Sequence, residues 1–134
     1  MKTKVKDLTI WITGASSGIG EALSIALAKR GASIILSGRD KDKLEAVKSR
    51  CKNSKKHIVV SFDIADAKQA KEAYETIKAQ TGKVDWLINN AGVSQRSLIM
   101  ETTEDVERQI MEIDYFAQTR LTRLVLPDMI AQGG

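Results

Sequence analysis

The feature that most constrains the fold is a glycine-rich segment, TGASSGIG, at residues 13–20. It lies between a short apolar run and a helical pattern of apolar residues at 19–30. A strand, a glycine-rich turn and a helix in this order can hold phosphates, because the helix N-terminus presents unpaired N–H groups and positive dipole charge. Gly14 allows a sharp turn, Gly18 removes a side chain where phosphates approach, and Gly20 lets the helix lie close to its strand. The segment therefore predicts a phosphate-binding loop.

Short apolar runs alternate with helical patterns along the rest of the chain. The predicted strands lie at 8–12, 33–37, 57–62 and 84–89, and the predicted helices at 19–30, 40–51, 66–82 and 103–131. Asp40 and Asp66 are predicted N-caps, and Gly31 and Gly82 are predicted to end helices. His57 begins a strand after a lysine-rich loop, so we expect its side chain to be exposed.

This alternation predicts a parallel sheet with helices on both faces. Right-handed crossovers give the strand order 3-2-1-4, the first half of a doubly wound, Rossmann-type α/β/α dinucleotide fold. The competing order 2-1-3-4 would be flavodoxin-like and would also bind phosphates at the first loop. The chain contains no internal repeat or linker, so residues 1–134 are expected to form one domain.

Composition disfavours several classes of protein. The chain is 43% hydrophobic and 28% charged, and no apolar run approaches the roughly 18 residues of a membrane span. Cys51 is the only cysteine and His57 the only histidine, so we expect no disulfide, no metal site and a cytoplasmic location. The net charge of +4 comes partly from lysines in residues 41–56, but no aromatic residue is interleaved there to stack on bases. We therefore expect no nucleic-acid partner and no membrane segment.

The end of the second predicted strand, Ser37-Gly38-Arg39, bears on the choice of cofactor. In dinucleotide folds an acidic residue at this strand end binds the 2′-hydroxyl of NAD. Gly38 occupies that position here, and the Arg39 guanidinium can bind a 2′-phosphate through paired, charge-assisted hydrogen bonds. A solvent-exposed arginine at a strand end is the plain alternative. Together with the phosphate-binding loop, the pattern favours NADP over NAD.

Polar and small residues also follow the third and fourth predicted strands. Asp63 could accept a hydrogen bond from the adenine amino group, or could simply be a turn residue. The segment NNAG at 89–92 has small residues that admit a ribose or nicotinamide, although alone it would be read as a turn. Because the carboxyl ends of parallel strands meet at one edge, we expect both near the glycine-rich segment.

Over essentially its whole length the chain resembles the short-chain dehydrogenase/reductase family, in its single-domain Rossmann branch. The matching pieces, at the family's spacing, are TGASSGIG at 13–20, SGR at 37–39, Asp63 and NNAG at 89–92. Within the family, Trp11, residues 44–51 and SQRS at 94–97 are similar to the dehydrogenase/reductase member 7 group. The resemblance implies an NADP-dependent oxidoreductase that transfers hydride between NADP(H) and a small carbonyl or alcohol substrate.

The resemblance also implies which residues contact the cofactor. The pyrophosphate contacts would be Gly14, Ser16, Gly18, Ile19 and Gly20. The 2′-phosphate would lie on Arg39 with help from Ser16 or Ser17, the adenine on Asp63 and the backbone of Ile64, and the ribose on Asn90, Ala91 and Gly92. Thr13 would link the first strand to the NNAG segment, which is a structural role.

The family's active site combines an asparagine, a serine and a Tyr-x-x-x-Lys segment. The asparagine position falls on Asp114, whose backbone carbonyl would hold a water in a proton relay. The fifth strand, the serine and the Tyr-x-x-x-Lys segment would follow Gly134, so we expect these 134 residues to supply the cofactor-binding half and alone to turn over no carbonyl substrate. Tyr74 and Lys78 have the Tyr-x-x-x-Lys spacing, but their helix precedes the fourth strand, so we do not expect them to be catalytic.

A non-catalytic nucleotide-binding or regulatory module could use the same half-fold and is the alternative function. The fourth strand would form an apolar sheet edge, and in the family the last helix helps to form the dimer, so we expect a homo-oligomer. The substrate's identity is not predicted.

Overall fold

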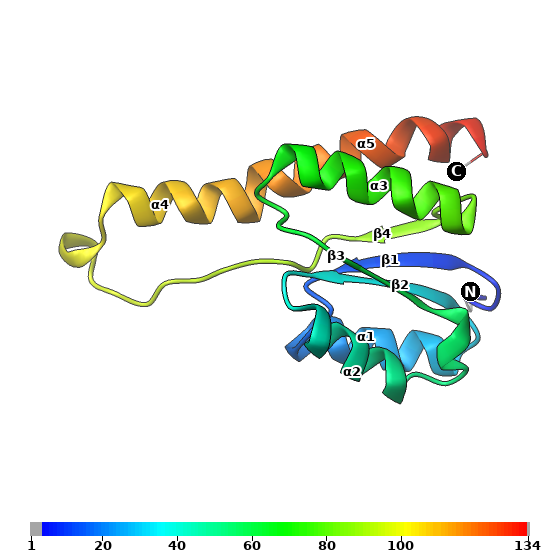
Figure 1. The fold of residues 1–134 in the computed structure, drawn as a ribbon. Helices are drawn as coiled ribbons and strands as arrows, with labels where there is room; N and C mark the ends of the chain where they lie inside the picture. Colours follow the sequence, from blue (N-terminus) through cyan, green and yellow to red (C-terminus); the bar gives the residue numbers. More distant parts are fainter. Residues whose placement is uncertain (1–3, 134) are drawn as a thin grey trace.

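A computed structural model describes residues 4–133 and contains one four-stranded parallel sheet with helices on both faces (Figure 1). The strands are β1 (Thr9–Thr13), β2 (Ser33–Gly38), β3 (Ile58–Ser61) and β4 (Trp86–Ile88). The helices are α1 (Gly18–Lys29), α2 (Lys41–Arg50), α3 (Ala67–Thr81), α4 (Glu104–Met111) and α5 (Gln118–Ala131), with short 3-10 turns η1 (Ser54–Lys56) and η2 (Ile99–Glu101) and a π-helical segment η3 (Glu112–Ala117). The strand order β3-β2-β1-β4 confirms the Rossmann-type prediction and excludes the flavodoxin-like order.

The predicted helix ends are confirmed where a local side chain or glycine determines them. Asp40 accepts a hydrogen bond from the backbone N–H of Lys43 at 3.1 Å, and so caps α2. Asp66 accepts from the N–H groups of Lys68 and Gln69, both at 3.0 Å, and so caps α3. Gly82 ends α3 in the left-handed conformation with φ of +76°.

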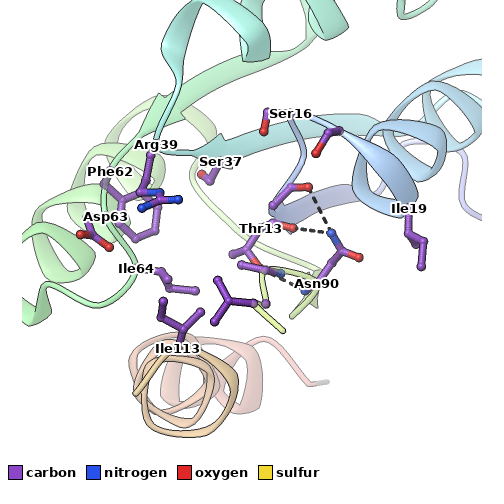
Figure 2. A pocket seen from close by; sticks show the side chains of 16 residues that line it. Thr13, Ser16, Ile19, Ser37, Arg39, Phe62, Asp63, Ile64, Asn90 and Ile113 are labelled. Carbon is purple, nitrogen blue, oxygen red and sulfur yellow. Dashed lines mark hydrogen bonds between the residues drawn. The ribbon is translucent and has the colours of Figure 1, made fainter. Parts of the chain in front are cut away.

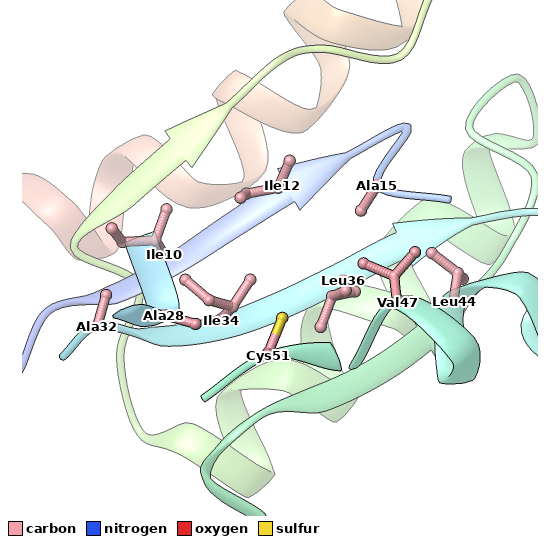
Figure 3. Packing of buried hydrophobic residues seen from close by; sticks show 10 residues of the cluster. All are labelled: Ile10, Ile12, Ala15, Ala28, Ala32, Ile34, Leu36, Leu44, Val47 and Cys51. Carbon is pink, nitrogen blue, oxygen red and sulfur yellow. The ribbon is translucent and has the colours of Figure 1, made fainter. Parts of the chain in front are cut away.

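Alternate residues of the central strands face two separate cores. On one face, Ile10, Ile12, Ile34 and Leu36 pack against α1 and α2 (Figure 3). On the other face, Trp11 and Ile35 pack against α3 and α5. Helices therefore cover both faces of the sheet, and the carboxyl ends of its strands are left open to the surface.

The most buried face of α1 is formed by small residues. Within the helical pattern at 19–30, Leu23 and Leu27 are half-buried against the core, whereas Ile19 is 72% exposed and Ala26 is exposed too. The buried residues are instead Gly20, Ser24 and Ala28. These are small, and the Ser24 hydroxyl donates to the Gly20 carbonyl at 2.7 Å, so the helix lies close against β1. Close approach of these small residues, with Leu23, Ile25 and Leu27 packed half-buried beside them, therefore forms the face toward the sheet.

Tyr74 and Lys78 join α3 to α5. The Tyr74 ring stacks on Trp11 with 6.1 Å between ring centroids, and its hydroxyl donates to the Asp128 carboxylate at 2.6 Å. Lys78 pairs with the same carboxylate at 2.7 Å. Burial and the neighbouring Asp128 carboxylate raise the pKa of Tyr74, whereas hydrogen bonds from Lys78 and Tyr74 lower the pKa of Asp128. These contacts account for the Tyr-x-x-x-Lys spacing as a clamp between two helices.

His57 is buried, so the prediction of an exposed side chain is wrong. Its imidazole Nδ1 accepts from the backbone N–H of Ile34 at 3.0 Å, and its Nε2 lies 2.8 Å from the Lys52 carbonyl. Nδ1 can accept only in the neutral ring, so Nε2 carries the proton and donates to that carbonyl. Burial lowers the pKa of His57, and the charges of Lys56 and Lys48 lower it further against the opposing Lys52 hydrogen bond.

We expect the free energy of unfolding to fall as the pH is lowered from about 7.5 to about 5.5. The unfolded histidine has its ordinary pKa of 6.5, above the lowered folded value, so below pH 6.5 the unfolded chain binds the extra proton more readily. Urea unfolding at three pH values in this interval measures the effect. His57→Gln, whose amide can make both hydrogen bonds, should flatten the pH dependence; an equally steep dependence in this variant would contradict the assignment.

The predicted helix at 103–131 is divided into α4, η3 and α5. The π-helical turn of η3 shifts the phase of the side chains, and such turns are frequent at functional sites. Within residues 4–133, none of the helices combines the length and the apolar composition that a membrane crossing requires.

Candidate functional site

A cavity of about 370 Å³ opens at the carboxyl edge of the sheet, where a ligand of this fold class binds (Figure 2). All four strand ends contribute to its wall. The lining residues are Thr13, Gly14, Ser16, Ser17, Ile19, Ser37, Gly38, Arg39, Phe62, Asp63, Ile64, Asn90, Ala91, Gly92, Val93 and Ile113. The glycine-rich loop and the loops after β2, β3 and β4 are therefore assembled around one space, as the sequence predicts.

The glycine-rich loop is shaped by close backbone contacts. Gly14 has φ of +64°, and a Cβ there would lie 2.9 Å from Cα of Ala91. A Cβ on Gly20 would lie 2.2 Å from the Gly14 carbonyl oxygen and 2.6 Å from Nδ2 of Asn90. Gly18 has φ of +54° with open space around it. Gly20 therefore acts through packing beneath the loop, whereas Gly18 acts through its backbone conformation.

Asn90 and Thr13 fasten the NNAG segment to the glycine-rich loop. The Asn90 amide nitrogen donates to the carbonyls of Thr13 and Gly14 at 3.0 and 3.1 Å. The Thr13 hydroxyl oxygen accepts from the backbone N–H groups of Asn90 and Ala91 at 3.1 and 3.0 Å. Because the side-chain amide nitrogen of Asn90 donates both of its hydrogen bonds within the protein, its side-chain oxygen is the group left for a ligand.

Arg39 lies at the cavity end formed by β2. Its side chain is exposed, and among residues 4–133 no carboxylate pairs with it. A Cβ on Gly38 would lie 3.7 Å from the Ser16 hydroxyl oxygen, which is ordinary contact, so the glycine leaves room beside Ser16. The Trp11 indole N–H donates to the Ser37 hydroxyl at 2.8 Å and fixes that side chain on the cavity wall. Hydroxyls and an unpaired guanidinium thus surround this end of the cavity.

Asp63 begins a turn that carries Ile64 along the cavity wall. Its carboxylate accepts from the Ala65 N–H at 3.0 Å, and its own N–H donates to the Gln69 side chain at 3.0 Å. Both contacts hold the backbone of the loop between β3 and α3 in one conformation. Asp63 and Ile64 therefore reach the cavity from a loop that is anchored on both sides.

Asp114 lies in η3, and its side chain is outside the cavity lining. Its carboxylate accepts from the Val93 N–H at 2.9 Å, and a Cβ on Gly92 would lie 3.3 Å from the same oxygen. Gln118, one turn later, donates from its side chain to the Ala91 carbonyl at 2.7 Å. These contacts support the NNAG segment, so the geometry gives the Asp114 carboxylate a role in holding that segment.

The structure brings most of the residues selected from the sequence to one cavity. Gly18, Gly20 and Asp114 do not line it. Gly20 packs beneath the loop, and the Asp114 side chain faces Val93. Phe62, Val93 and Ile113 line the cavity and were missed. Phe62 could have been selected as the last residue of its predicted strand. Ile113 carried no such signal, because it depends on the phase of the π-helical turn.

The family profile and the curated relatives that match this chain are all short-chain dehydrogenases/reductases. A sequence profile described as short chain dehydrogenase matches residues 8–134. Human dehydrogenase/reductase SDR family member 7 is 42% identical over 132 residues, which cover 95% of this chain and 39% of that protein. The bovine member 7B is 36% identical and 42% covered. The chain thus spans about two fifths of the length of the curated relatives it matches.

Solved structures of related enzymes have the same fold over nearly the whole of this chain. L-sorbose reductase from Gluconobacter frateurii, complexed with NADPH and L-sorbose, gives a TM-score of 0.90 at 32% identity and covers 100% of this chain and 52% of its own. Gluconate 5-dehydrogenase from Burkholderia cenocepacia, in complex with NADP and tartrate, gives 0.87 at 27% identity, with 97% and 51% covered.

Proposed function

The chain belongs to the short-chain dehydrogenase/reductase family, and from this premise we propose that its cavity binds NADP(H) in an oxidoreductase acting on a small carbonyl or alcohol. The observation that carries the proposal is the meeting of the glycine-rich loop, Arg39, Asp63 and the NNAG segment on one cavity. Each faces the space where a different part of a dinucleotide would lie. The alternative, a nucleotide-binding module without catalysis, uses the same cavity and differs only in turnover.

The cavity residues suit an extended, anionic cofactor. The N-terminus of α1 and the N–H groups of Ser16 to Ile19 would hold the pyrophosphate, since Gly14 and Gly20 keep side chains out of the way. Asp63 and Ile64 would contact the adenine, and Asn90, Ala91 and Gly92 the ribose nearer the nicotinamide. When bound, NADP(H) would supply or accept the hydride.

The preference for NADP(H) rests on the end of β2. Gly38 stands where an acidic side chain would bind a 2′-hydroxyl, and Arg39 and Ser16 stand beside it. A 2′-phosphate there would gain charge-assisted hydrogen bonds from the guanidinium, with no carboxylate to repel it. The complexes of the two related enzymes with NADPH and NADP support the same preference.

The proposal is tested on the product of the complete natural reading frame, because residues 1–134 alone are expected to bind the cofactor without turning over a carbonyl substrate. The absorbance of NADPH and NADH is followed while this protein is incubated with a panel of ketones and aldehydes. We expect substrate-dependent oxidation of NADPH, and much slower oxidation of NADH. Tight NADPH binding without turnover of any panel member, or of alcohols with NADP in the reverse direction, would instead favour the non-catalytic module. Absence of binding would contradict both functions.

We also propose that the protein forms homo-oligomers. Large apolar side chains are exposed around η2 and η3, among them Leu98 (69%), Ile99 (84%), Met100 (95%), Tyr115 (54%) and Phe116 (50%). These exposed apolar side chains lie at both ends of α4, and apolar exposure of this kind is typical of surfaces that a partner covers. Sedimentation equilibrium over a range of protein concentrations is expected to give a mass of at least twice that of the chain; a single monomeric species throughout would contradict the proposal.

A further inference from the structure

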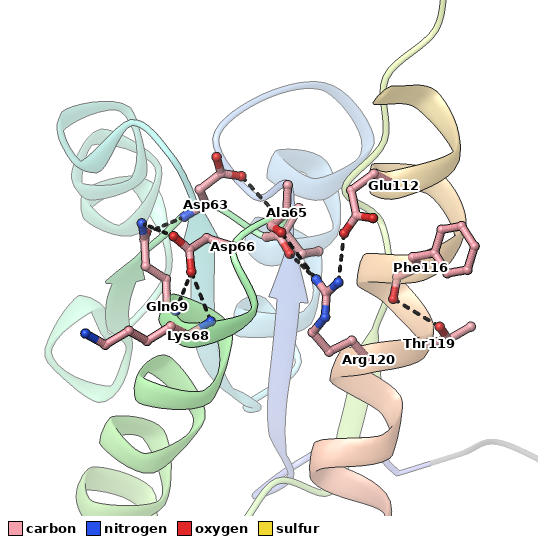
Figure 4. Close-up of polar contacts among 10 residues, drawn as sticks. Asp63, Ala65, Asp66, Lys68, Gln69, Glu112, Phe116, Thr119 and Arg120 are labelled. Carbon is pink, nitrogen blue, oxygen red and sulfur yellow. Dashed lines mark hydrogen bonds and ion pairs between the residues drawn. The ribbon is translucent and has the colours of Figure 1, made fainter. Parts of the chain in front are cut away.

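The segment from η3 to the first turn of α5 touches the loops at both ends of the cavity. Toward the nicotinamide end it supports the NNAG segment through Asp114 and Gln118. Toward the adenine end it presents Arg120, whose guanidinium reaches the loop between β3 and α3 (Figure 4). One stretch of helix therefore contacts loops that are far apart in the sequence.

Arg120 makes contacts in two directions. Its Nη1 donates to the carbonyls of Ile64 and Ala65 at 3.3 and 3.4 Å, and its Nη2 pairs with the Glu112 carboxylate at 2.8 Å. The side chain is 28% exposed, so the guanidinium is partly shielded from water. A planar guanidinium can satisfy both directions at once because its donors form a rigid fork, which a lysine ammonium does not offer.

The loop that Arg120 contacts already has its own internal bonds. Asp63 closes a turn onto Ala65, and Asp66 caps α3 beyond it. These bonds fix the shape of the loop, while core packing and the contacts of Tyr74 and Lys78 with Asp128 set the position of α3 relative to α5. The Arg120 contacts add a direct link from α5 to the loop itself, and they fall on Ile64, whose side chain lines the cavity.

We propose that Arg120 is a positioning residue that holds Asp63 and Ile64 at the adenine end of the cofactor cavity, with Glu112 orienting its guanidinium. This inference rests on the proposed binding of NADP(H). It assigns Arg120 no contact with the cofactor or substrate. Its effect is therefore confined to the half of the dinucleotide that lies against the β3–α3 loop.

Calorimetric titration with two fragments of the cofactor tests this confinement. The probes are 2′,5′-ADP, which carries the adenine half, and reduced nicotinamide mononucleotide, which carries the other half; NADPH is the complete ligand. We expect Arg120→Met to weaken binding of 2′,5′-ADP and NADPH roughly five- to tenfold, and to change binding of the mononucleotide less than about twofold. Arg123→Met is the matched control, since Arg123 is exposed on the same helix and lines a surface hollow with Asn89 and Thr122, away from this loop.

Two further variants distinguish a local effect on the loop from a general loss of folding. Arg120→Lys keeps the charge but cannot reach Glu112 and both carbonyls together, so we expect an intermediate loss confined to the adenine half. Glu112→Gln should shift binding in the same direction by less. Equal weakening of both fragments, or no weakening by Arg120→Met, would overturn the inference while leaving the proposed function intact. If the unsubstituted protein bound neither NADPH nor 2′,5′-ADP, the proposed function and this inference would both fail.

Discussion

Gly20→Ala is expected to abolish NADPH binding and to lower the free energy of unfolding by about 3 kcal/mol. The added methyl group would lie 2.2 Å from the Gly14 carbonyl oxygen and 2.8 Å from the carbonyl carbon. These are backbone atoms in the phosphate-binding loop, so relief requires the loop or the start of α1 to move. Either movement also disturbs the Asn90 amide, which lies 2.6 Å from the same position and ties this loop to the NNAG segment.

Gly82→Ala is the matched control for this effect. Gly82 has φ of +76° but open space around it, at the end of α3, so alanine there adds only the strain of the left-handed conformation, about 1 kcal/mol. Urea unfolding and NADPH titration of both variants separate steric displacement from backbone strain. A Gly20→Ala protein that unfolds like the Gly82→Ala protein and binds NADPH normally would contradict the loop geometry.

Arg39→Ala is expected to weaken NADPH binding roughly 10- to 100-fold and to change NADH binding by less than about twofold. The guanidinium would make charge-assisted hydrogen bonds only to the 2′-phosphate, the group in which the two cofactors differ. Because Arg39 is exposed and pairs with no carboxylate among residues 4–133, its removal should leave the free energy of unfolding nearly unchanged.

Arg30→Ala provides the comparison for Arg39→Ala. Arg30 is an exposed arginine at the far end of α1, so its removal lowers the net charge equally without touching the cavity. Titrations of both variants with both cofactors at one fixed ionic strength measure the local effect. Equal losses in the two variants would assign the binding to net charge, and a parallel loss of NADH affinity would place Arg39 elsewhere on the dinucleotide.

Local chemistry made much of this fold predictable. Asp40, Asp66 and Gly82 act through bonds and backbone angles that involve only their sequence neighbours, and each does so in the structure. The strand order follows from chain alternation and the handedness of crossovers, which are also readable from the sequence. The wall of the cavity was largely predictable for the same reason, because strand ends meet at one edge.

Contacts between distant segments were not predictable. His57 was expected to be exposed because it follows lysines, but its ring satisfies an N–H from β2, 23 residues earlier in the chain. Ile19 sits at an apolar position of its helix yet faces the cavity, because small residues occupy the side that approaches the sheet. Arg120 reads as an ordinary helical arginine until the loop 55 residues earlier is placed beside it. In each case the environment of the side chain is determined by a residue on another helix, strand or loop.

The relative affinity of the unsubstituted protein for NADPH and NADH tests the proposed 2′-phosphate site most directly. Calorimetric titration of one protein preparation with each cofactor, at the same pH and ionic strength, measures both dissociation constants. We predict that NADPH binds at least about tenfold more tightly, a difference of about 1.4 kcal/mol. Equal affinities, or tighter binding of NADH, would contradict the assignment of the β2 end, with Gly38 and Arg39, to a 2′-phosphate.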